Sequence, residues 1–279
     1  MKKIIGALIP KMVGCYFNII SFFQPEKIAK KAFILFCTPR KGKVLKVQKG
    51  FLEDAKDLLL EKEGKTIQTY RWIGAGPTVL LMHGWESNSY RWRNFIPILQ
   101  AEDYNIIAMD APAHGNSGGN TMHLPLYAEC AQTVIETYHP KYIIGHSLGG
   151  MTMLYNQYKY LNVKVEKLVS LAAPSELSDF MRQYKAILGL SNKMMRILEA
   201  YFIKKFNVNF AEFSSSKFVK QINKKGLLIH DELDKIAPIW CTEQVHTNWQ
   251  GSQLIRTKGL GHSLHQDKIR NKVVEFLKS

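Results

Sequence analysis

The 279-residue sequence contains few cysteines, and they have no recognisable arrangement. None belongs to a Cys-x-x-Cys pair or to a regular framework; they are Cys15, Cys37, Cys130 and Cys241. Their spacing does not indicate the disulfide framework of a small secreted domain, and it favours reduced, independent thiols in a cytoplasmic protein. We also expect no structural metal, because no cluster of Cys and His has zinc-ligand spacing.

A long uninterrupted hydrophobic run is also missing. The best candidate, residues 4–23, is interrupted near its middle by Pro10 and Lys11. A lysine at the centre of a membrane helix costs about 2.5–3.5 kcal/mol on insertion scales, which argues against a transmembrane segment. No small-residue cleavage site follows, so a signal peptide is not favoured either. Lys11, Asn18 and Ser21 recur at nearly helical spacing, which predicts an amphipathic helix with a wide apolar face.

Acidic residues are scarce at the N-terminus. Residues 1–50 contain eleven basic residues and only Glu26 as an acid, so this part carries +10 of the net charge of +15. No nucleic-acid-binding module accompanies the charge, and we do not expect a nucleic-acid partner. Two interpretations of the segment stay open. It holds the protein peripherally on an anionic membrane, or it packs on the rest of the molecule with its lysines solvated.

From about residue 45, short apolar runs alternate with helical patterns. The overall composition, 46% hydrophobic and 22% charged, is that of a folded globular protein. The expected strands are Thr66–Trp72, Thr78–Met82, Asn105–Met109, Tyr142–Ile144, Lys167–Ala172, Leu227–Ile229 and Gln253–Arg256. Such alternation predicts an α/β fold whose mostly parallel central sheet has helices on both faces.

The alternation is interrupted once, by about fifty residues with helical periodicity alone between Ala172 and Gly226. We expect a helical cap at about residues 176–225, because insertions of this kind often cover a binding site. Extra packing helices without such a role are the alternative. The predicted organisation is therefore a basic amphipathic helical segment over residues 1–44, and one domain with its cap over residues 45–279.

A candidate nucleophile follows the apolar run at Tyr142–Ile144, in the sequence Gly145-His146-Ser147-Leu148-Gly149. A helical pattern comes next, so this G-x-S-x-G motif has the strand–turn–helix context of a nucleophile elbow. The turn strains Ser147, and side chains two residues to either side would collide with it, which explains Gly145 and Gly149. The helix N-terminus also favours developing negative charge. The pattern predicts Ser147 as a nucleophile.

A serine hydroxyl needs a base to take its proton, and the base must be oriented by a third group. His262 follows the expected strand at Gln253–Arg256, and Asp234 follows the one at Leu227–Ile229. Both therefore belong at the carboxyl ends of later strands, where they can meet Ser147. The order Ser, Asp, His differs from that of chymotrypsin and of subtilisin.

The oxyanion of an acyl-transfer reaction needs two N–H donors. One is the backbone N–H of Leu148, directly after the nucleophile. The other is expected from the loop after the Thr78–Met82 strand, where Gly84 permits a close backbone approach and Trp85 supplies the N–H. The Trp85 ring would also form a wall of the acyl pocket, or it is simply packed in the core.

The motifs together resemble the α/β-hydrolase superfamily, specifically its serine esterases and lipases, and the chain is similar to small hydrolases of the Bacteroidetes. The matching motifs run in the family's order over about three-quarters of the chain; they are His83-Gly84-Trp85, Asp110–Ser117, Gly145–Gly150, Asp234 with Pro238, and Gly261-His262. The resemblance implies the α/β-hydrolase fold, and it places Asp110 and His114 in a structural turn.

Two positions depart from the family's pattern. Ala113 stands where the loop after the fourth strand usually has glycine. Asp231 stands where the acid loop usually has glycine, so Asp231 and Asp234 compete for the acid role. Asp234 matches the family's position four residues before Pro238, and we assign the role to it. The resemblance implies nothing about residues 1–50.

We predict hydrolysis of a carboxylic ester through an acyl-Ser147 intermediate, with a small-molecule substrate, lipid esters included, and without a cofactor. Serine at this position excludes the aspartate-nucleophile branches of the fold. Thioesterase, lactonase, C–C hydrolase and acyltransferase reactions on the same triad are the alternatives. A non-catalytic ligand-binding protein of the same fold remains a further rival, as does an interaction protein that acts through its basic N-terminus.

Overall fold

The computed structural model describes residues 2–62 and 64–279, with side chains from residue 8 onward except at 63. The side chains of the first seven residues of the expected N-terminal segment therefore lie outside the described residues. The chain divides into two compact units. The larger consists of Pro39–Ser175 and Ser215–Ser279, and the smaller joins the chain up to Thr38 with Glu176–Ser214.

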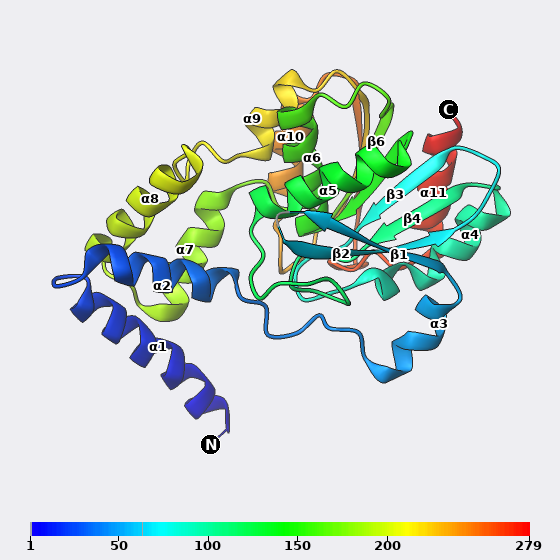
Figure 1. Cartoon of the computed structure of the whole chain (residues 1–279). Helices are drawn as coiled ribbons and strands as arrows, with labels where there is room; N and C mark the ends of the chain where they lie inside the picture. The colour runs from blue at the N-terminus through cyan, green and yellow to red at the C-terminus, as the bar shows by residue number, and fades with distance from the viewer. Residues whose placement is uncertain (1, 63) are drawn as a thin grey trace. The chain divides into compact units, whose positions relative to one another are not determined.

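The larger unit is built on a β-sheet (Figure 1). This sheet has eight strands in the order β1-β2-β4-β3-β5-β6-β7-β8. β2 is antiparallel to both of its neighbours, and the other pairs are parallel. The strands are β1 (Lys56–Lys62), β2 (Lys65–Trp72), β3 (Thr78–Met82), β4 (Asn105–Met109), β5 (Tyr142–His146), β6 (Lys167–Leu171), β7 (Lys225–Asp231) and β8 (Ser252–Thr257). The predicted mostly parallel α/β sheet is confirmed.

Helices cover both faces of this sheet. Leu81 of β3 packs in a core cluster with α4 (Ile96–Ala101) and α11 (Asp267–Lys278). Leu80 and Met82 point to the other face, in a cluster with α5, α6 and α10. The strands at the centre are buried on both faces, which is why they are continuous apolar runs in the sequence. The remaining elements of this unit are η1 (Lys46–Gln48), α3 (Lys49–Glu53), η2 (Ser89–Asn94), α5 (Leu124–Tyr138), α6 (Leu148–Tyr160), α9 (Ser215–Phe218), η3 (Val219–Gln221) and α10 (Trp240–Asn248).

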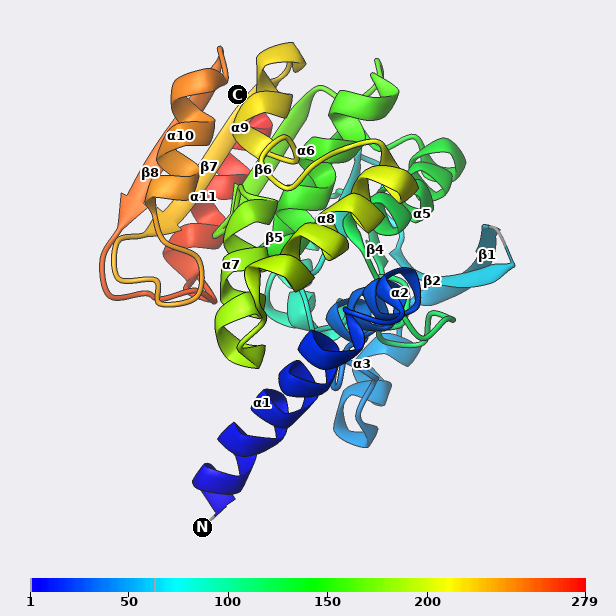
Figure 2. The same cartoon turned by 90° about the vertical axis from the view of Figure 1, so that its left-hand side faces the viewer.

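Strand β1 was not expected from the sequence. It lies at the edge of the sheet opposite β8 (Figure 2) and pairs only with β2. Leu58 and Leu59 are 45% and 56% exposed although they point to opposite faces of the sheet. The strand therefore lacks the alternation of buried apolar and exposed polar residues by which strands are recognised in a sequence. Its pairing with β2 defines it instead.

The smaller unit contains four long helices, α1 (Lys2–Ile20), α2 (Pro25–Cys37), α7 (Leu177–Leu188) and α8 (Asn192–Phe206). Helix α1 packs on α7, and α2 packs on α8. A Cβ on Gly14 would overlap the carbonyl oxygen of Leu188, so glycine is what permits the close approach of α1 to the end of α7. Asn18 accepts from the Ser191 N–H (2.8 Å) and donates to the Gly189 carbonyl (2.9 Å).

The limits of the helical parts differ from those expected. The inserted part of the smaller unit ends at Ser214 and not near residue 225, because α9 and η3 pack in the larger unit against α6 and α10. The N-terminal part ends at Thr38 and not at 44, since the Gly42 carbonyl accepts from Gly115 N–H (2.8 Å) in the larger unit. No helix in the described part of the chain is long and apolar enough to cross a membrane.

Candidate active site

Ser147 occupies the sharp turn between β5 and α6. Its φ of +53° lies in the left-handed region, which a residue with a side chain rarely adopts. Two backbone hydrogen bonds hold the turn. The Ser147 N–H donates to the Leu171 carbonyl of β6 (2.8 Å), and the Gly150 N–H donates to the Ser147 carbonyl (2.9 Å). The hydroxyl is thus held at the start of α6 by contacts outside the site.

Three glycines make the close approaches around this turn possible. A Cβ on Gly149 would overlap the Met82 carbonyl oxygen of β3, and one on Gly145 would lie 2.5 Å from the Gly150 Cα. The steric reason for these two glycines is therefore their packing on β3 and α6, whereas the sequence suggested a collision with Ser147. Gly84 is the glycine that contacts the nucleophile, because its Cβ would lie 2.9 Å from the Ser147 Cβ.

The three residues predicted as a triad lie within hydrogen-bond distance of one another. His262 Nε2 is 2.9 Å from Ser147 Oγ, and His262 Nδ1 is 2.7 Å from Asp234 Oδ2. An ionised carboxylate accepts from Nδ1–H, which leaves Nε2 free to accept from the serine hydroxyl. Asp234 follows β7 and His262 follows β8, so the parallel strands bring both to the carboxyl edge of the sheet. The Asp234 side chain is fully buried, and that of His262 is 16% exposed.

The Asp234 carboxylate is fixed by further donors. Its Oδ1 accepts from the N–H groups of Ile236 (2.8 Å) and Ala237 (3.1 Å). The Nε2 of His230 lies 3.3 Å from its Oδ2 and 2.8 Å from the Ala237 carbonyl. Burial lowers the pKa of His230, so its imidazole is neutral and Nε2–H is the donor to both oxygens. His230 was not predicted from the sequence, where its one signal is a polar side chain at the end of a buried apolar strand.

Asp231, the competing acid, has different partners. Its oxygens accept from the Leu260 N–H (2.8 Å), the Thr257 hydroxyl (2.9 Å) and the Gly259 N–H (3.2 Å). Burial opposes ionisation, but these hydrogen bonds, that from Leu260 first, hold the pKa of Asp231 below its ordinary value. Asp231 therefore ties β7 to the segment that leads to His262, and the carboxylate that bonds His262 is that of Asp234.

The two expected oxyanion donors flank the nucleophile. Leu148 is the first residue of α6, and its N–H belongs to the unpaired group at a helix N-terminus. Trp85 directly follows Gly84, which contacts Ser147. Neither N–H donates a hydrogen bond to another group in the described part of the chain. Trp85 is 36% exposed and its ring lies edge-on to that of His114, so it is not a core side chain.

A buried carboxylate supports the loop that carries Trp85. Asp110 accepts from the Ser89 N–H and hydroxyl (both 2.8 Å) and from the Asn116 N–H (2.9 Å), and burial raises its pKa. His114 Nε2 accepts from the Glu86 N–H (3.0 Å), and burial lowers the His114 pKa. Ala113, which replaces the family's usual glycine, has a φ of +64° and so adopts a conformation that glycine would adopt without strain.

Two side chains bind the backbone carbonyls of His262 and of the residue after it. His146 Nε2 lies 2.9 Å from the His262 carbonyl oxygen, and burial lowers the pKa of His146, so the neutral ring donates from this nitrogen. Arg91 of η2 donates from Nη2 to the carbonyl of Ser263 (2.7 Å). Neither contact was predictable from the sequence, because both join residues more than a hundred positions apart. Among the described residues, no group of three or more His, Cys, Asp or Glu side chains has the arrangement of a metal site.

Comparisons with known proteins agree with this architecture. A family model of the alpha/beta hydrolase fold matches residues 77–197. The uncharacterized hydrolase YugF of Bacillus subtilis is 22% identical over 247 residues, which cover 72% of this chain and 90% of that protein. The chain therefore has the α/β-hydrolase fold. A solved esterase from Exiguobacterium antarcticum superposes on this protein with a TM-score of 0.64 at 18% identity, over 80% of this chain and all of that one, and shows the fold alone.

Other matches of this chain are shorter and more similar. The pimeloyl-[acyl-carrier protein] methyl ester esterase of Aeromonas hydrophila is 37% identical over 83 residues, or 28% of this chain and 31% of that protein. Several of the first curated relatives are matched over only 24–31% of their length. The comparisons therefore support a hydrolase without identifying its substrate.

Proposed function

We propose that this protein cleaves carboxylic esters through an acyl-enzyme on Ser147. The observation that supports it is the continuous hydrogen-bonded chain from Asp234 through His262 to Ser147 Oγ, with distances of 2.7 and 2.9 Å. His262 takes the hydroxyl proton as Oγ forms a bond to the ester carbonyl carbon. Asp234 keeps the imidazole in the required tautomer and stabilises the imidazolium that results.

The N–H groups of Trp85 and Leu148 are assigned to the oxyanion of the tetrahedral intermediate. Each contributes about 3 kcal/mol to lowering the barrier. When the intermediate collapses, the bond from the carbonyl carbon to the alcohol oxygen breaks, and His262 gives its proton to that oxygen. Water then attacks the acyl-Ser147 with His262 again as the base, which releases the acid and restores the serine.

Ester hydrolysis is preferred among the reactions of this triad because a relative at 37% identity is named a methyl ester esterase. Thioester, lactone and C–C bond hydrolysis and acyl transfer to an alcohol use the same residues and are the alternatives. A non-catalytic ligand-binding role is disfavoured, because Ser147, Asp234 and His262 are all present and within hydrogen-bond distance. We also propose the inserted helices α7 and α8 as the cap that selects the substrate.

Hydrolysis of p-nitrophenyl esters of increasing acyl length by the purified protein tests the proposal. A thioester and a lactone of matched acyl length are included, and Ser147→Ala is the control. We expect ester turnover that disappears in Ser147→Ala. Turnover of the thioester or lactone alone would reassign the reaction on the same triad. Equal turnover by the wild type and Ser147→Ala would contradict the acyl-enzyme.

We further propose that helix α1 contacts an anionic membrane surface. Its apolar side chains Leu8, Met12 and Ile19 share one face of the helix and are 55–64% exposed. Phe22, just after the helix, is 67% exposed with Lys193 Nζ over its ring at 3.4 Å. Exposed apolar and aromatic side chains beside lysines are the pattern of a helix that lies on an anionic lipid surface.

Deleting the segment would not test this contact cleanly. Ile28 and Phe33 of α2 are buried, and the Phe33 ring lies 5.2 Å from that of Phe202 in α8. Point substitution is therefore the better approach. The Met12→Glu/Ile19→Glu variant should no longer sediment with anionic vesicles at low salt, whereas wild type and Val163→Glu, which alters an 88% exposed valine of the larger unit, should sediment. Wild type that stays in solution would contradict the contact.

A further inference from the structure

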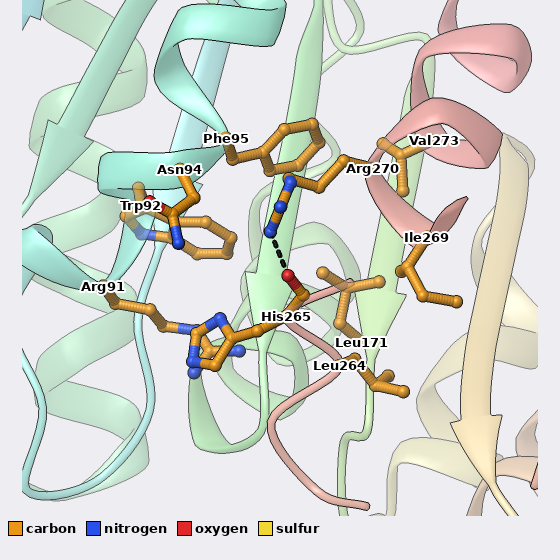
Figure 3. Close-up of a pocket in the computed structure, with 10 residues that line it drawn as sticks. All are labelled: Arg91, Trp92, Asn94, Phe95, Leu171, Leu264, His265, Ile269, Arg270 and Val273. Carbon is orange, nitrogen blue, oxygen red and sulfur yellow. Dashed lines mark hydrogen bonds between the residues drawn. The ribbon is translucent and has the colours of Figure 1, made fainter. Parts of the chain in front are cut away.

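A cavity lies beside the segment that follows His262, inside the larger unit (Figure 3). Its cavity volume is about 20 Å³, which is room for one water molecule or one ion of similar size. Apolar side chains of β6, η2 and α11 form much of its wall. Arg91 reaches toward His265 from η2, and Arg270 reaches toward the same segment from α11.

Two hydrogen-bond donors at this cavity have no acceptor. The Nε of Arg91 and the indole Nε1 of Trp92 are both buried, and neither has a hydrogen-bond partner among the described residues. Both residues line the cavity. An unsatisfied buried donor costs about 1–3 kcal/mol, and more when it carries charge. Two such donors at one cavity therefore indicate an acceptor that the protein chain itself does not provide.

The charge around the cavity is positive and largely uncompensated. Arg91, His265 and Arg270 line it, and none of the residues that line it is acidic. Arg270 has Asp267 as its partner, but Asp267 is 77% exposed and lies outside the lining. Arg91 takes part in none of the salt bridges found in the described part of the chain.

The titration of the lining groups reflects the same imbalance. Burial, with the charge of Arg93, lowers the pKa of Arg91 to about 9. Partial burial and the positive charges of Arg91, Arg93 and Arg270 lower the pKa of His265 to about 4. No carboxylate offsets either shift. A bound anion would stabilise the charged form of Arg91, which a neutral water molecule does only weakly.

We propose that this cavity binds a monatomic monovalent anion such as chloride on Arg91 Nε, Trp92 Nε1 and the Arg270 guanidinium. Arg91 and Trp92 belong to η2 and Arg270 belongs to α11, so an anion bound to all three would link these two elements. Phosphate esters are disfavoured because the cavity is small and much of its wall is apolar. The site is separate from Ser147 and does not require the substrate.

The anion also has a route to the proposed active site. Arg91 donates to the Ser263 carbonyl (2.7 Å), and Arg270 donates to the carbonyl of His265. Both arginines thus hold the backbone directly after His262. Fixing them with one anion restricts the movement of that segment and keeps His262 within reach of Ser147 Oγ. Arg91 is in this sense a positioning residue, a role that rests on the proposed function.

Chloride and bromide are the probes for this site. At constant ionic strength, replacing the large anion gluconate with about 0.2 M chloride should raise the Tm of the whole protein by about 5 °C. Crystals grown with bromide should show an anomalous peak between Arg91 and Trp92. Bromide absent from the cavity, or a Tm that is the same in both salts, would contradict the proposal.

Two variants separate binding from a general salt effect. Trp92→Phe keeps an aromatic ring and loses only the Nε1 donor, and Arg91→Lys keeps the charge and loses the Nε donor. Each should weaken chloride binding, measured from the Tm titration, about tenfold. Trp240→Phe, at a partly exposed tryptophan outside the cavity, is the matched control and should respond as wild type does. An unchanged response in both variants would overturn the assignment.

Kinetics then test the positioning role. Chloride should raise kcat for an ester substrate in the wild type without changing KM, and Trp92→Phe should lose this response. If the Tm shift occurs and kcat does not respond, the link to His262 is wrong while the anion site stands. Because the Tm shift and the bromide peak need no turnover, they would remain if ester hydrolysis itself were disproved.

Discussion

At the scale of single residues, the two neighbouring carboxylates at and just after the end of β7 have separate tasks that their partners define. Asp234 Oδ2 accepts from His262, and its Oδ1 accepts from two backbone N–H groups. Asp231 accepts from the last residue of β8 and from the loops after β7 and β8, among them the Leu260 N–H. The first arrangement orients a base, and the second fixes a loop.

Substitution of each acid by asparagine should separate these tasks. Asp234→Asn should lower kcat by a factor on the order of 10⁴. The variant no longer holds His262 in the tautomer with a proton on Nδ1, and it no longer stabilises the positively charged imidazolium that forms during the reaction. Asp231→Asn should keep kcat within about tenfold and lower the free energy of unfolding by about 1–3 kcal/mol, because charge-assisted bonds are lost. Ester kinetics and urea denaturation measure the two effects. If Asp231→Asn were the variant that abolished turnover, the acid role would pass to Asp231.

The site residues could be predicted from the sequence only where a motif contains them. Ser147 stands in a G-x-S-x-G motif, and His262 and Asp234 stand after apolar strands in a characteristic order. His230 and Arg91 could not be found in this way. His230 sits at the end of a buried strand, and Arg91 bonds a residue 172 positions away, so only the folded chain shows what they contact.

At the scale of elements, the turn between β5 and α6 depends on how closely α6 approaches β3. Gly149 lies in the first turn of α6, where alanine would normally stabilise a helix by about 1 kcal/mol. Its Cβ, however, would overlap the Met82 carbonyl oxygen of β3. A backbone oxygen within a central strand cannot move aside cheaply, so the close approach outweighs the helix propensity.

Gly149→Ala should therefore lower stability by about 2 kcal/mol or more and reduce the yield of folded protein. Gly50→Ala is the control, because Gly50 also lies in a helix and nothing is within 4 Å of its Cβ position. That variant should be neutral or slightly stabilising. Thermal unfolding of both compares them. Equal stability of the two variants would show that α6 tolerates a wider separation from β3.

A helix or strand could be predicted from the sequence where its burial leaves a recognisable pattern of apolar residues. β3 and β4 match their expected bounds, because each is a short apolar run covered on both faces. β1 was missed because its side chains are mostly exposed. The packing of α1 on α7 could not be predicted from the sequence either. It depends on the close approach of Gly14 to Leu188 and on the hydrogen bond from Asn18 to the Gly189 carbonyl, and both join residues far apart in the chain.

At the scale of the whole molecule, buried neutral histidines couple folding to pH. Burial lowers the pKa of His83 to about 3, and it also lowers those of His114, His146 and His230. In the unfolded chain each titrates near 6.5. Below that pH the unfolded state therefore binds more protons than the folded state, and stability falls as pH falls.

Each such histidine contributes a slope on the order of 1.4 kcal/mol per pH unit once the pH is well below 6.5. We expect the free energy of unfolding to be nearly constant between about pH 7 and 8 and to fall steeply between about pH 6 and 5. Urea titrations across this range, with fluorescence of the tryptophans as the signal, measure the slope. A free energy of unfolding that stays level down to about pH 5 would show that the buried histidines take up protons in the folded state.

The central claim is that Ser147 is a nucleophile activated by His262. Intact-mass spectrometry after exposure to a fluorophosphonate tests it most directly, because the reagent bonds covalently only to an activated serine. The account predicts one adduct on the wild type, located to Ser147 by peptide mapping, none on Ser147→Ala, and much slower labelling of His262→Ala. A wild type that stays unlabelled, or an adduct that persists in Ser147→Ala, would contradict it.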